Sequence, residues 1–177
     1  MVMQCFLKEN EIQTHNWADI FQGVENAVES LVLYRKHEGE NLLKDISDRI
    51  ALIDEFLKEI VPLSEFRIEN IKSTLKDKIE NSELQIDPNR FEQELIYYLE
   101  KQDITEEIVR LQSHLNYFLE TTKTDSPNGK KLGFICQEIG REINTIGSKA
   151  NNFKIQSMVV NMKEENEKIK QNIFNIA

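Results

Sequence analysis

An all-α fold is predicted by three features of this 177-residue sequence. Glycine and proline are scarce, with six and three residues, and charged residues make up 30% of the chain. The apolar residues recur every three or four positions, which is the spacing of a helix rather than a strand. We expect a helical bundle with a long antiparallel helical hairpin, at about 40–82, projecting from it.

The first helix is expected after a short extended lead of residues 1–15. Asn16 suits the N-cap of a helix that begins at Trp17, because its side chain can accept a hydrogen bond from the first turn. The residues expected on the buried side are Ile20, Val24, Ala27, Val28, Leu31 and Val32. Because His37-Glu38-Gly39 gives no clear stop signal, we expect the helix to continue through it.

The hairpin is predicted by a heptad-like seam followed by a proline. The seam consists of Leu43, Ile46, Ile50, Ile53, Leu57 and Ile60. Its alternating spacings of three and four favour a coiled-coil partner. Pro62 is expected to break or kink the helix, since proline lacks a backbone donor, and 64–80 is expected to return. Such a hairpin could be a mobile arm around a polymer substrate or, equally, a bundle member or oligomer contact.

Two helix starts follow the hairpin. Asp87-Pro88 combines a capping residue with a proline in the first turn. The buried side of this helix consists of Phe91, Leu95, Tyr98 and Leu99. Asp103 with Glu106 gives a second start of the capping-box kind. Asp103 could instead be a ligand, but Asp is so common at N-caps that we favour the cap.

The segments 103–120 and 129–152 each place a polar arc opposite an apolar stripe, because residues three, four and seven apart share a helix face. The first arc consists of Asp103, Glu106, Glu107, Arg110, Ser113, His114 and Tyr117. The second consists of Lys131, Phe134, Glu138, Arg141, Glu142, Thr145, Ser148 and Lys149. If the stripes pack together, the arcs border one groove, the best candidate site. The alternative is that they form ordinary surface ion pairs, worth roughly 0.2–1 kcal/mol each.

The last helix is expected to carry a seam of apolar residues. The seam consists of Ile155, Val159, Met162, Ile169, Ile173 and Ile176. Asn166 takes an inward position in it, where a buried Asn commonly fixes register or oligomer state. Cys136 lies on the apolar stripe of 129–152 and is expected to be a small buried hydrophobe.

The net charge of −9 argues against a generic nucleic-acid-binding surface, which would be strongly positive, and we expect no DNA partner. Residues 129–154 differ, with a local excess of positive charge. The basic residues there are Lys130, Lys131, Arg141, Lys149 and Lys154, and the acidic ones Glu138 and Glu142.

No apolar run approaches the ~20 residues of a membrane helix, no signal peptide is visible, and two cysteines fit a reducing compartment. We therefore expect a cytoplasmic protein without a membrane partner.

The two arc-bearing segments resemble a known family. Residues 103–118 read DITEEIVRLQSHLNYF and residues 129–152 read GKKLGFICQEIGREINTIGSKANN. They are similar to the C-terminal signature of the YicC-like family of bacterial endoribonucleases, in which a D-x-T-E-E-x-x-R-L-x-S-H-L-x-x-F helix precedes GRKLDFLxQExxREINTxGSKxxD. Weaker resemblance covers 31–43 and 159–177. Gly133 departs from the family's usual Asp, and Gly140 from its usual Asn.

The resemblance also implies a domain organisation. Members of the family carry an N-terminal α/β domain before the helical half. We therefore expect 1–15 to be a lead-in or the remnant of such a domain, 16–90 to hold the first helix and the hairpin, and 91–177 to be the helical domain with the signature.

The resemblance further implies RNA cleavage with a divalent metal, Mn²⁺ or Mg²⁺, in a homo-oligomer that is a hexamer in the family. Carboxylates suit either ion, and an imidazole can bind manganese or transfer a proton. The candidates for catalysis and metal binding are His114, Glu107, Glu138 and Glu142. Arginine grips phosphate with two prongs, and aromatic rings stack on unpaired bases. The RNA-binding candidates are Arg35, Arg110, Lys131, Phe134, Arg141, Asn144, Thr145, Ser148 and Lys149.

Two further hypotheses remain open. The chain could be a non-catalytic oligomerisation or scaffold module, in which the polar arcs are subunit contacts and Arg141 pairs with Glu107. Alternatively, this chain could be inactive by itself because the N-terminal domain completes the site.

Overall fold

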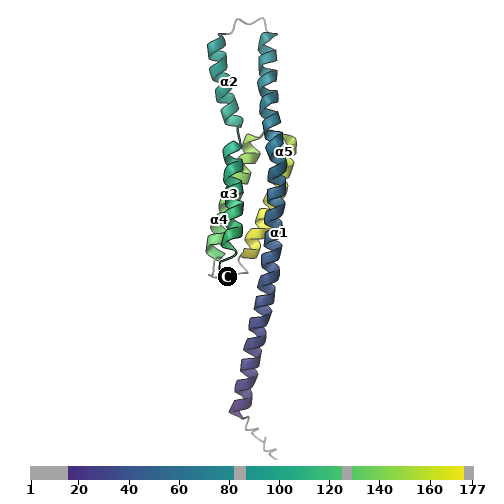
Figure 1. Cartoon of the computed structure of the whole chain (residues 1–177), viewed down its shortest axis with the longest axis vertical. Coiled ribbons are helices and arrows are strands. Elements are labelled where there is room, and N and C mark those ends of the chain that lie inside the picture. The colour runs from purple at the N-terminus through teal and green to yellow at the C-terminus, as the bar shows by residue number, and fades with distance from the viewer. Residues whose placement is uncertain (1–15, 82–86, 125–128, 174–177) are drawn as a thin grey trace, which may run out of the picture. The chain divides into compact units, whose positions relative to one another are not determined.

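The computed structural model describes residues 16–81, 87–124 and 129–173, and every regular element within these ranges is an α-helix. The helices are α1 (Trp17–Glu80), α2 (Pro88–Gln102), α3 (Thr105–Thr121), α4 (Gly129–Lys149) and α5 (Phe153–Ile173) (Figure 1). The predicted all-α fold is confirmed. Among the described residues, no helix combines the length and apolar character that a membrane span requires.

The chain divides into two compact units, residues 1–40 and 41–177. The described part of the first unit is the beginning of α1, and its side chains are almost all exposed. The predicted burial of its apolar stripe is therefore wrong: Val28, for example, is 53% exposed. Within this unit no second described element packs against the helix, so the stripe has no surface to be buried against.

The second unit contains the predicted hairpin, but its turn lies later in the chain. α1 continues through Pro62, so the predicted break and the return over 64–80 are wrong. The antiparallel partner of the end of α1 is α2, which runs back beside it (Figure 1). A proline inside a helix costs about 3 kcal/mol, and burial on both sides of it, at Ile60 and Arg67, offsets that cost.

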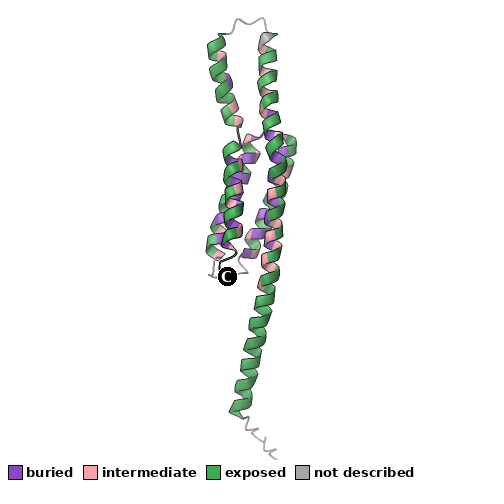
Figure 2. Cartoon of the chain, in the orientation of Figure 1, coloured by how far each residue is buried: buried purple, intermediate pink, exposed green. Residues whose placement is uncertain are grey.

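The core of the second unit is built from the predicted apolar stripes. α3 packs on α4 and α4 on α5, while the seam of α1 joins the same core. Its fully buried members include Ile46, Ile50, Ile53 and Ile60 of α1, Leu111 and Phe118 of α3, Ile139, Ile143 and Ile146 of α4, and Met162 and Ile169 of α5. Figure 2 shows buried positions along the faces of the helices that pack together. Each such side chain contributes about 1.5–3 kcal/mol by leaving water.

Two of the predicted helix starts are confirmed by hydrogen bonds. Two capping oxygens accept a backbone N–H of the following turn, Asn16 from Ala18 (3.3 Å) and Asp87 from Asn89 (3.0 Å). The Asp103 carboxylate, one residue before the N-cap of α3 at Ile104, accepts from the Thr105 N–H at 2.9 Å. Asp103 also accepts from the Thr105 hydroxyl at 2.6 Å. This hydrogen bond is the largest cause of a lowered pKa for Asp103. Ile104 occupies the N-cap position of α3 without a side-chain hydrogen bond, so the predicted N-cap at Asp103 is one residue too early, although the Asp103 carboxylate does accept from the first helical residue.

Arg67 ties the ends of α2 and α4 to α1. Its buried guanidinium donates to the backbone carbonyls of Gln102, Lys149 (3.1 Å) and Ala150, and to the Gln102 side chain at 3.1 Å. Carbonyls at helix C-termini lack partners within the helix and carry the negative end of the helix dipole. The Arg67 guanidinium therefore supplies hydrogen-bond donors and a positive charge to the C-terminal ends of α2 and α4 at the same time. Burial lowers the pKa of Arg67, although arginine stays charged.

Asn166 fixes the contact between α4 and α5. The residue is buried, as its inward position predicted, and its amide donates to the Cys136 carbonyl at 3.2 Å. The two helices also approach closely at Gly147, where an added Cβ would lie 2.9 Å from the Val159 Cγ1 atom. The buried Asn thus sets the register between two helices of the same chain.

Candidate functional site

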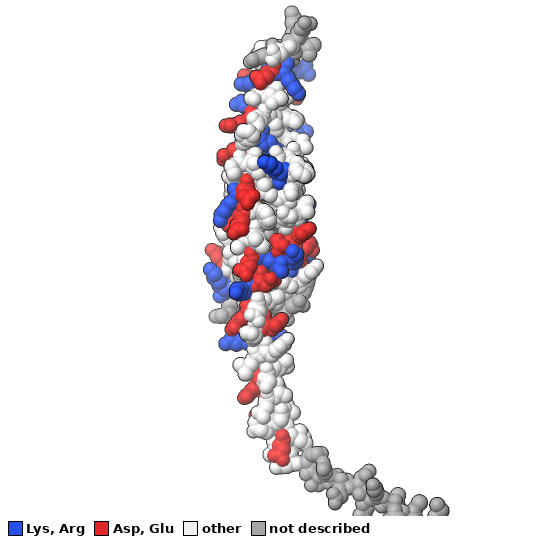
Figure 3. Space-filling model, turned by 90° about the vertical axis from the view of Figure 1, so that its right-hand side faces the viewer, with Lys and Arg blue, Asp and Glu red and all other residues white. Residues whose placement is uncertain are grey.

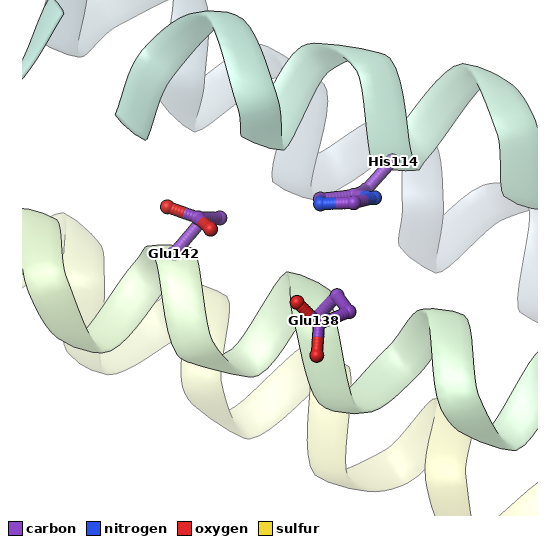
Figure 4. A group of neighbouring side chains, drawn as sticks. All are labelled: His114, Glu138 and Glu142. Carbon is purple, nitrogen blue, oxygen red and sulfur yellow. The ribbon is translucent and has the colours of Figure 1, made fainter. Parts of the chain in front are cut away.

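The polar arcs of α3 and α4 meet at three side chains. His114 points from α3 toward Glu138 and Glu142, which lie one turn apart on α4 (Figure 4). One possible ligand atom from each residue lies within 4.8 Å of those of the other two. Among the residues that the structure describes, this is the one group of three or more His, Cys, Asp or Glu side chains so close together. We call it the three-donor group.

The members of the three-donor group differ in burial. Glu142 is only 4% exposed, His114 is half-buried and Glu138 is exposed. Glu138 lies 3.8 Å from the Arg141 guanidinium. Neither His114 nor Glu142 has a hydrogen bond or ion pair with another described residue. The Glu142 oxygens are not among the fully buried side-chain atoms that lack a partner, so this largely buried carboxylate remains reachable by solvent or a cation.

The donor set fits a divalent cation. Carboxylate oxygens are the preferred ligands of Mg²⁺ and Mn²⁺, and an imidazole nitrogen shifts the preference toward a transition metal. With metal–oxygen bonds of about 2.1 Å, two ligands on opposite sides of an ion are about 4.2 Å apart. The observed limit of 4.8 Å exceeds that value by little. Small side-chain rotations of the long Glu138 and Glu142 would close the difference.

Glu107, a predicted metal ligand, is not a member of the three-donor group. Its carboxylate is buried and lies 2.7 Å from the Lys149 ammonium, while its second oxygen has no partner. The packing therefore pairs Glu107 with Lys149, and the Arg141–Glu107 pair of the scaffold hypothesis does not form within the chain. Of the four predicted metal ligands, the structure brings three together.

The predicted RNA-binding residues of α4 form an exposed row beside the three-donor group. Lys131, Phe134, Arg141, Asn144 and Ser148 are exposed, and Thr145 is half-buried. The Lys131 ammonium lies 4.8 Å from the centre of the Tyr117 ring of α3. The two hydroxyl groups donate to backbone carbonyls of α4, Thr145 to Arg141 at 3.1 Å and Ser148 to Thr145 at 3.0 Å. Both hydroxyl hydrogens are therefore used within α4, and these two side chains can only accept a hydrogen bond from a ligand.

Two predicted RNA-binding arginines, Arg110 and Arg35, do not belong to this exposed row of α4. Arg110 forms an exposed ion pair with Glu106 one turn earlier on α3. Arg35 belongs to the first unit, residues 1–40, and is exposed there. On the face seen in Figure 3, basic and acidic side chains are intermixed rather than gathered into a positive patch, as expected from a net charge of −9.

Comparison with known proteins identifies the family to which this chain belongs. The model of the family described as Endoribonuclease YicC-like, C-terminal, matches residues 60–177. The chain belongs to the YicC-like endoribonuclease family. The resemblance seen in 103–118 and 129–152 is thereby confirmed, and the matched region contains the whole three-donor group.

Two YicC-like relatives match most of this chain. It is 40% identical over 165 residues to the probable endoribonuclease YicC of Clostridioides difficile (strain 630), covering 90% of this chain and 56% of the relative. It is 29% identical over 158 residues to the probable endoribonuclease YicC of Haemophilus influenzae, covering 89% and 55%. The chain thus spans about half the length of these curated relatives.

The burial of two carboxylates in this YicC-like domain was not expected from the sequence. Glu107 and Glu142 were assigned to polar arcs, yet both are buried. A signal was available for Glu142, which lies three residues after Ile139 and four before Ile146, both core positions. Residues at the edge of an apolar stripe are covered when the neighbouring helix packs closely.

The Cys136 thiol of this YicC-like domain belongs to the core. Burial raises the pKa of Cys136 to about 12, so the thiol stays protonated near neutral pH. Its predicted role as a small buried hydrophobe is confirmed.

Proposed function

We propose that this chain carries the metal-binding active site of an endoribonuclease that cleaves RNA with Mn²⁺ or Mg²⁺. The observation that carries the proposal is the three-donor group, His114, Glu138 and Glu142, whose ligand atoms converge within 4.8 Å. Membership of the YicC-like endoribonuclease family supports RNA as the substrate. The proposal includes cleavage in the cytoplasm, where RNA substrates are found.

The residues of the three-donor group would hold the cation. Once bound, a divalent metal supplies Lewis-acid stabilisation of phosphoryl oxygens and can activate a water molecule. Glu142 contributes a fixed, nearly buried carboxylate. Glu138 is exposed and reaches the group from the same side of α4, one turn away. His114 supplies a nitrogen ligand or, alternatively, a group that transfers a proton near neutral pH.

Arg141 is the residue we assign to the phosphate. Its side chain is 71% exposed and lies 3.8 Å from Glu138, so it is held beside the three-donor group without being buried by it. A guanidinium can donate two parallel hydrogen bonds to a phosphate. Lys149 is less available, because it pairs with the buried Glu107 at 2.7 Å.

The test combines metal binding with cleavage. The purified chain is titrated with Mn²⁺ by calorimetry and incubated with labelled single-stranded RNA, with and without metal. We expect saturable Mn²⁺ binding that is lost in His114→Ala and Glu142→Gln, with cleavage lost in parallel. His37→Ala, which changes an exposed histidine outside the three-donor group, is the matched control.

The two readouts separate the parts of the proposal. Equal Mn²⁺ affinity in the parent, His114→Ala and Glu142→Gln chains would refute the metal site. Metal binding without cleavage by this chain would indicate that the remainder of the longer relatives is needed for activity.

Assembly of several copies is a second candidate function. The observation that favours it is the row of exposed apolar side chains on the first part of α1, including Trp17, 75% exposed, and Val28. Large exposed apolar surfaces usually mark contacts with other macromolecules. We propose a homo-oligomer, with the hexamer implied by the family resemblance as its expected size, to be measured by sedimentation equilibrium.

A further inference from the structure

A pocket lies between the beginning of α4 and the end of α5. Its volume is about 360 Å³, within the range of small-molecule sites. α4 contributes Lys130, Gly133, Phe134 and Gln137, and α5 contributes Lys170 and Ile173. Lys170 could not be predicted from the polar arcs, because it lies on a different helix.

Phe134 gives the pocket an open aromatic wall. The ring belongs to a residue that is 59% exposed, so it contributes little to the core. Gly133 leaves the neighbouring space free, since no atom lies within 4 Å of where a Cβ would be. An exposed ring beside free space is the arrangement on which an unpaired base can stack.

The charges around the pocket complement a nucleic-acid backbone. Lys130 is exposed, and Lys170 lines the pocket with its ammonium 3.6 Å from the exposed Glu167. Lys131 follows Lys130 and lies over the Tyr117 ring. The two lysines that line the pocket, Lys130 and Lys170, can contact the phosphates on both sides of a base stacked on Phe134, whereas Lys131 does not line it.

One wall of the pocket, Phe134, lies one helical turn from Glu138 of the three-donor group. Phe134 precedes Glu138 by four residues, so the two side chains share a helix face about 6 Å apart along the axis. A strand whose phosphate lies at the three-donor group would bring an adjacent nucleotide to Phe134.

We propose that this pocket binds one unpaired nucleobase next to the phosphate that is cleaved, stacked on the Phe134 ring. The inference rests on the proposed function, and it adds a preference for unpaired RNA at a defined position. A base in a duplex is stacked on its neighbours on both faces, so it cannot present a face to this ring.

The test measures binding in EDTA, so that no cleavage occurs. The full 177-residue chain is titrated with a short single-stranded RNA that contains one 2-aminopurine, whose fluorescence falls on stacking. We expect quenching in the parent chain, and a loss of affinity of about 5- to 100-fold in Phe134→Ala. Phe134→Tyr keeps the ring and should restore most of the affinity.

Two controls make the result specific. Phe153→Ala removes an aromatic side chain that is 85% exposed and does not line the pocket, and it should bind like the parent. An RNA with an abasic site in place of 2-aminopurine should bind the parent and Phe134→Ala chains equally. Gly133→Asp, which introduces a carboxylate into the pocket, should weaken binding of the base-containing RNA.

The outcomes separate this inference from the proposed function. Equal affinity of the parent and Phe134→Ala chains, or no RNA binding by this chain, would overturn the base pocket. If the Phe134→Ala chain loses self-association instead of RNA affinity, the pocket is a protein contact and the inference is wrong. Stacking without saturable Mn²⁺ binding would keep the pocket and refute the metal site of the proposed function. Mn²⁺-dependent cleavage without stacking would keep the proposed function and refute the base pocket.

Discussion

At the scale of single residues, two buried carboxylates on the same pair of helices have opposite environments. Glu107 lies 2.7 Å from Lys149, whereas Glu142 has no partner among the described residues. Leaving a buried charge unpaired is costly, while a paired one is stabilised by its partner. We interpret Glu142 as a residue kept for ligand binding at the expense of stability.

The first prediction compares these two residues. Without metal, Glu142→Gln should raise the free energy of unfolding by about 1 kcal/mol, because an unpaired buried charge is removed. Glu107→Gln should lower it by about 1–2 kcal/mol, a modest value because Lys149 is 33% exposed. Urea unfolding measures both, and added Mn²⁺ should stabilise the parent but not Glu142→Gln. Destabilisation by both substitutions in metal-free buffer would contradict this interpretation.

The second prediction concerns pH. The Glu165 carboxylate accepts hydrogen bonds from Lys168 at 2.6 Å and from Arg49 at 2.7 Å, and these bonds lower its pKa from the ordinary 4.5. The unfolded chain therefore binds the proton more tightly than the folded chain. The stability that Glu165 contributes is present above about pH 4.5 and is lost as the pH falls through the lowered folded pKa.

Urea unfolding between about pH 6 and pH 3 tests this dependence. In Glu165→Gln, the free energy of unfolding should fall less steeply as the pH is lowered than it does in the parent chain. Glu167→Gln, in a weaker and more exposed pair at 3.6 Å, should leave the slope close to that of the parent. Identical acid slopes in all three chains would count against a stabilising role for Glu165.

At the scale of elements, the packing of α4 on α5 depends on a missing side chain. Gly147 faces Val159, and an added Cβ would lie 2.9 Å from the Val159 Cγ1 atom. Valine is stiff about χ1, so one of the two helices would have to move. Gly133, in the same helix, has open space at the corresponding position.

The third prediction follows from these two glycines. Gly147→Ala should destabilise the chain by about 1 kcal/mol, because a clash of about 1–3 kcal/mol exceeds the gain of about 1 kcal/mol in helix propensity. Gly133→Ala should be neutral or stabilising by up to about 1 kcal/mol. Thermal unfolding followed by circular dichroism measures both. Stabilisation by Gly147→Ala would show that the helices are not in close contact there.

At the scale of the whole molecule, local signals in the sequence predicted the fold well and the surfaces less well. Helix starts such as Asp87 depend on residues within one turn, and they were confirmed. The predicted break at Pro62 is wrong because the local cost of the proline is outweighed by the burial of Ile60 and Arg67. That burial depends on helices that are distant in the sequence. The proximity of His114 to Glu138 followed from pairing two apolar stripes.

The remaining errors have a common physical cause. An apolar stripe shows that a surface must be covered, but it does not show what covers it. The stripe of 43–60 is covered by the other helices of the second unit. The stripe that includes Val28 is exposed in the single chain. The burial of Glu142 likewise depends on how closely α3 approaches α4, which sequence spacing does not determine.

The last prediction concerns this exposed stripe. If copies of the chain cover it, Val28→Asp should weaken self-association by more than about tenfold, since burying an unpaired carboxylate costs several kcal/mol. Thermal unfolding of the second unit should be unchanged, because Val28 is not part of its core. Asn26→Asp adds the same charge at an exposed polar position of the helix and should associate like the parent. Sedimentation equilibrium measures the mass of all three chains. A monomeric parent, or equal masses for the parent and Val28→Asp, would show that the stripe is not a contact between copies.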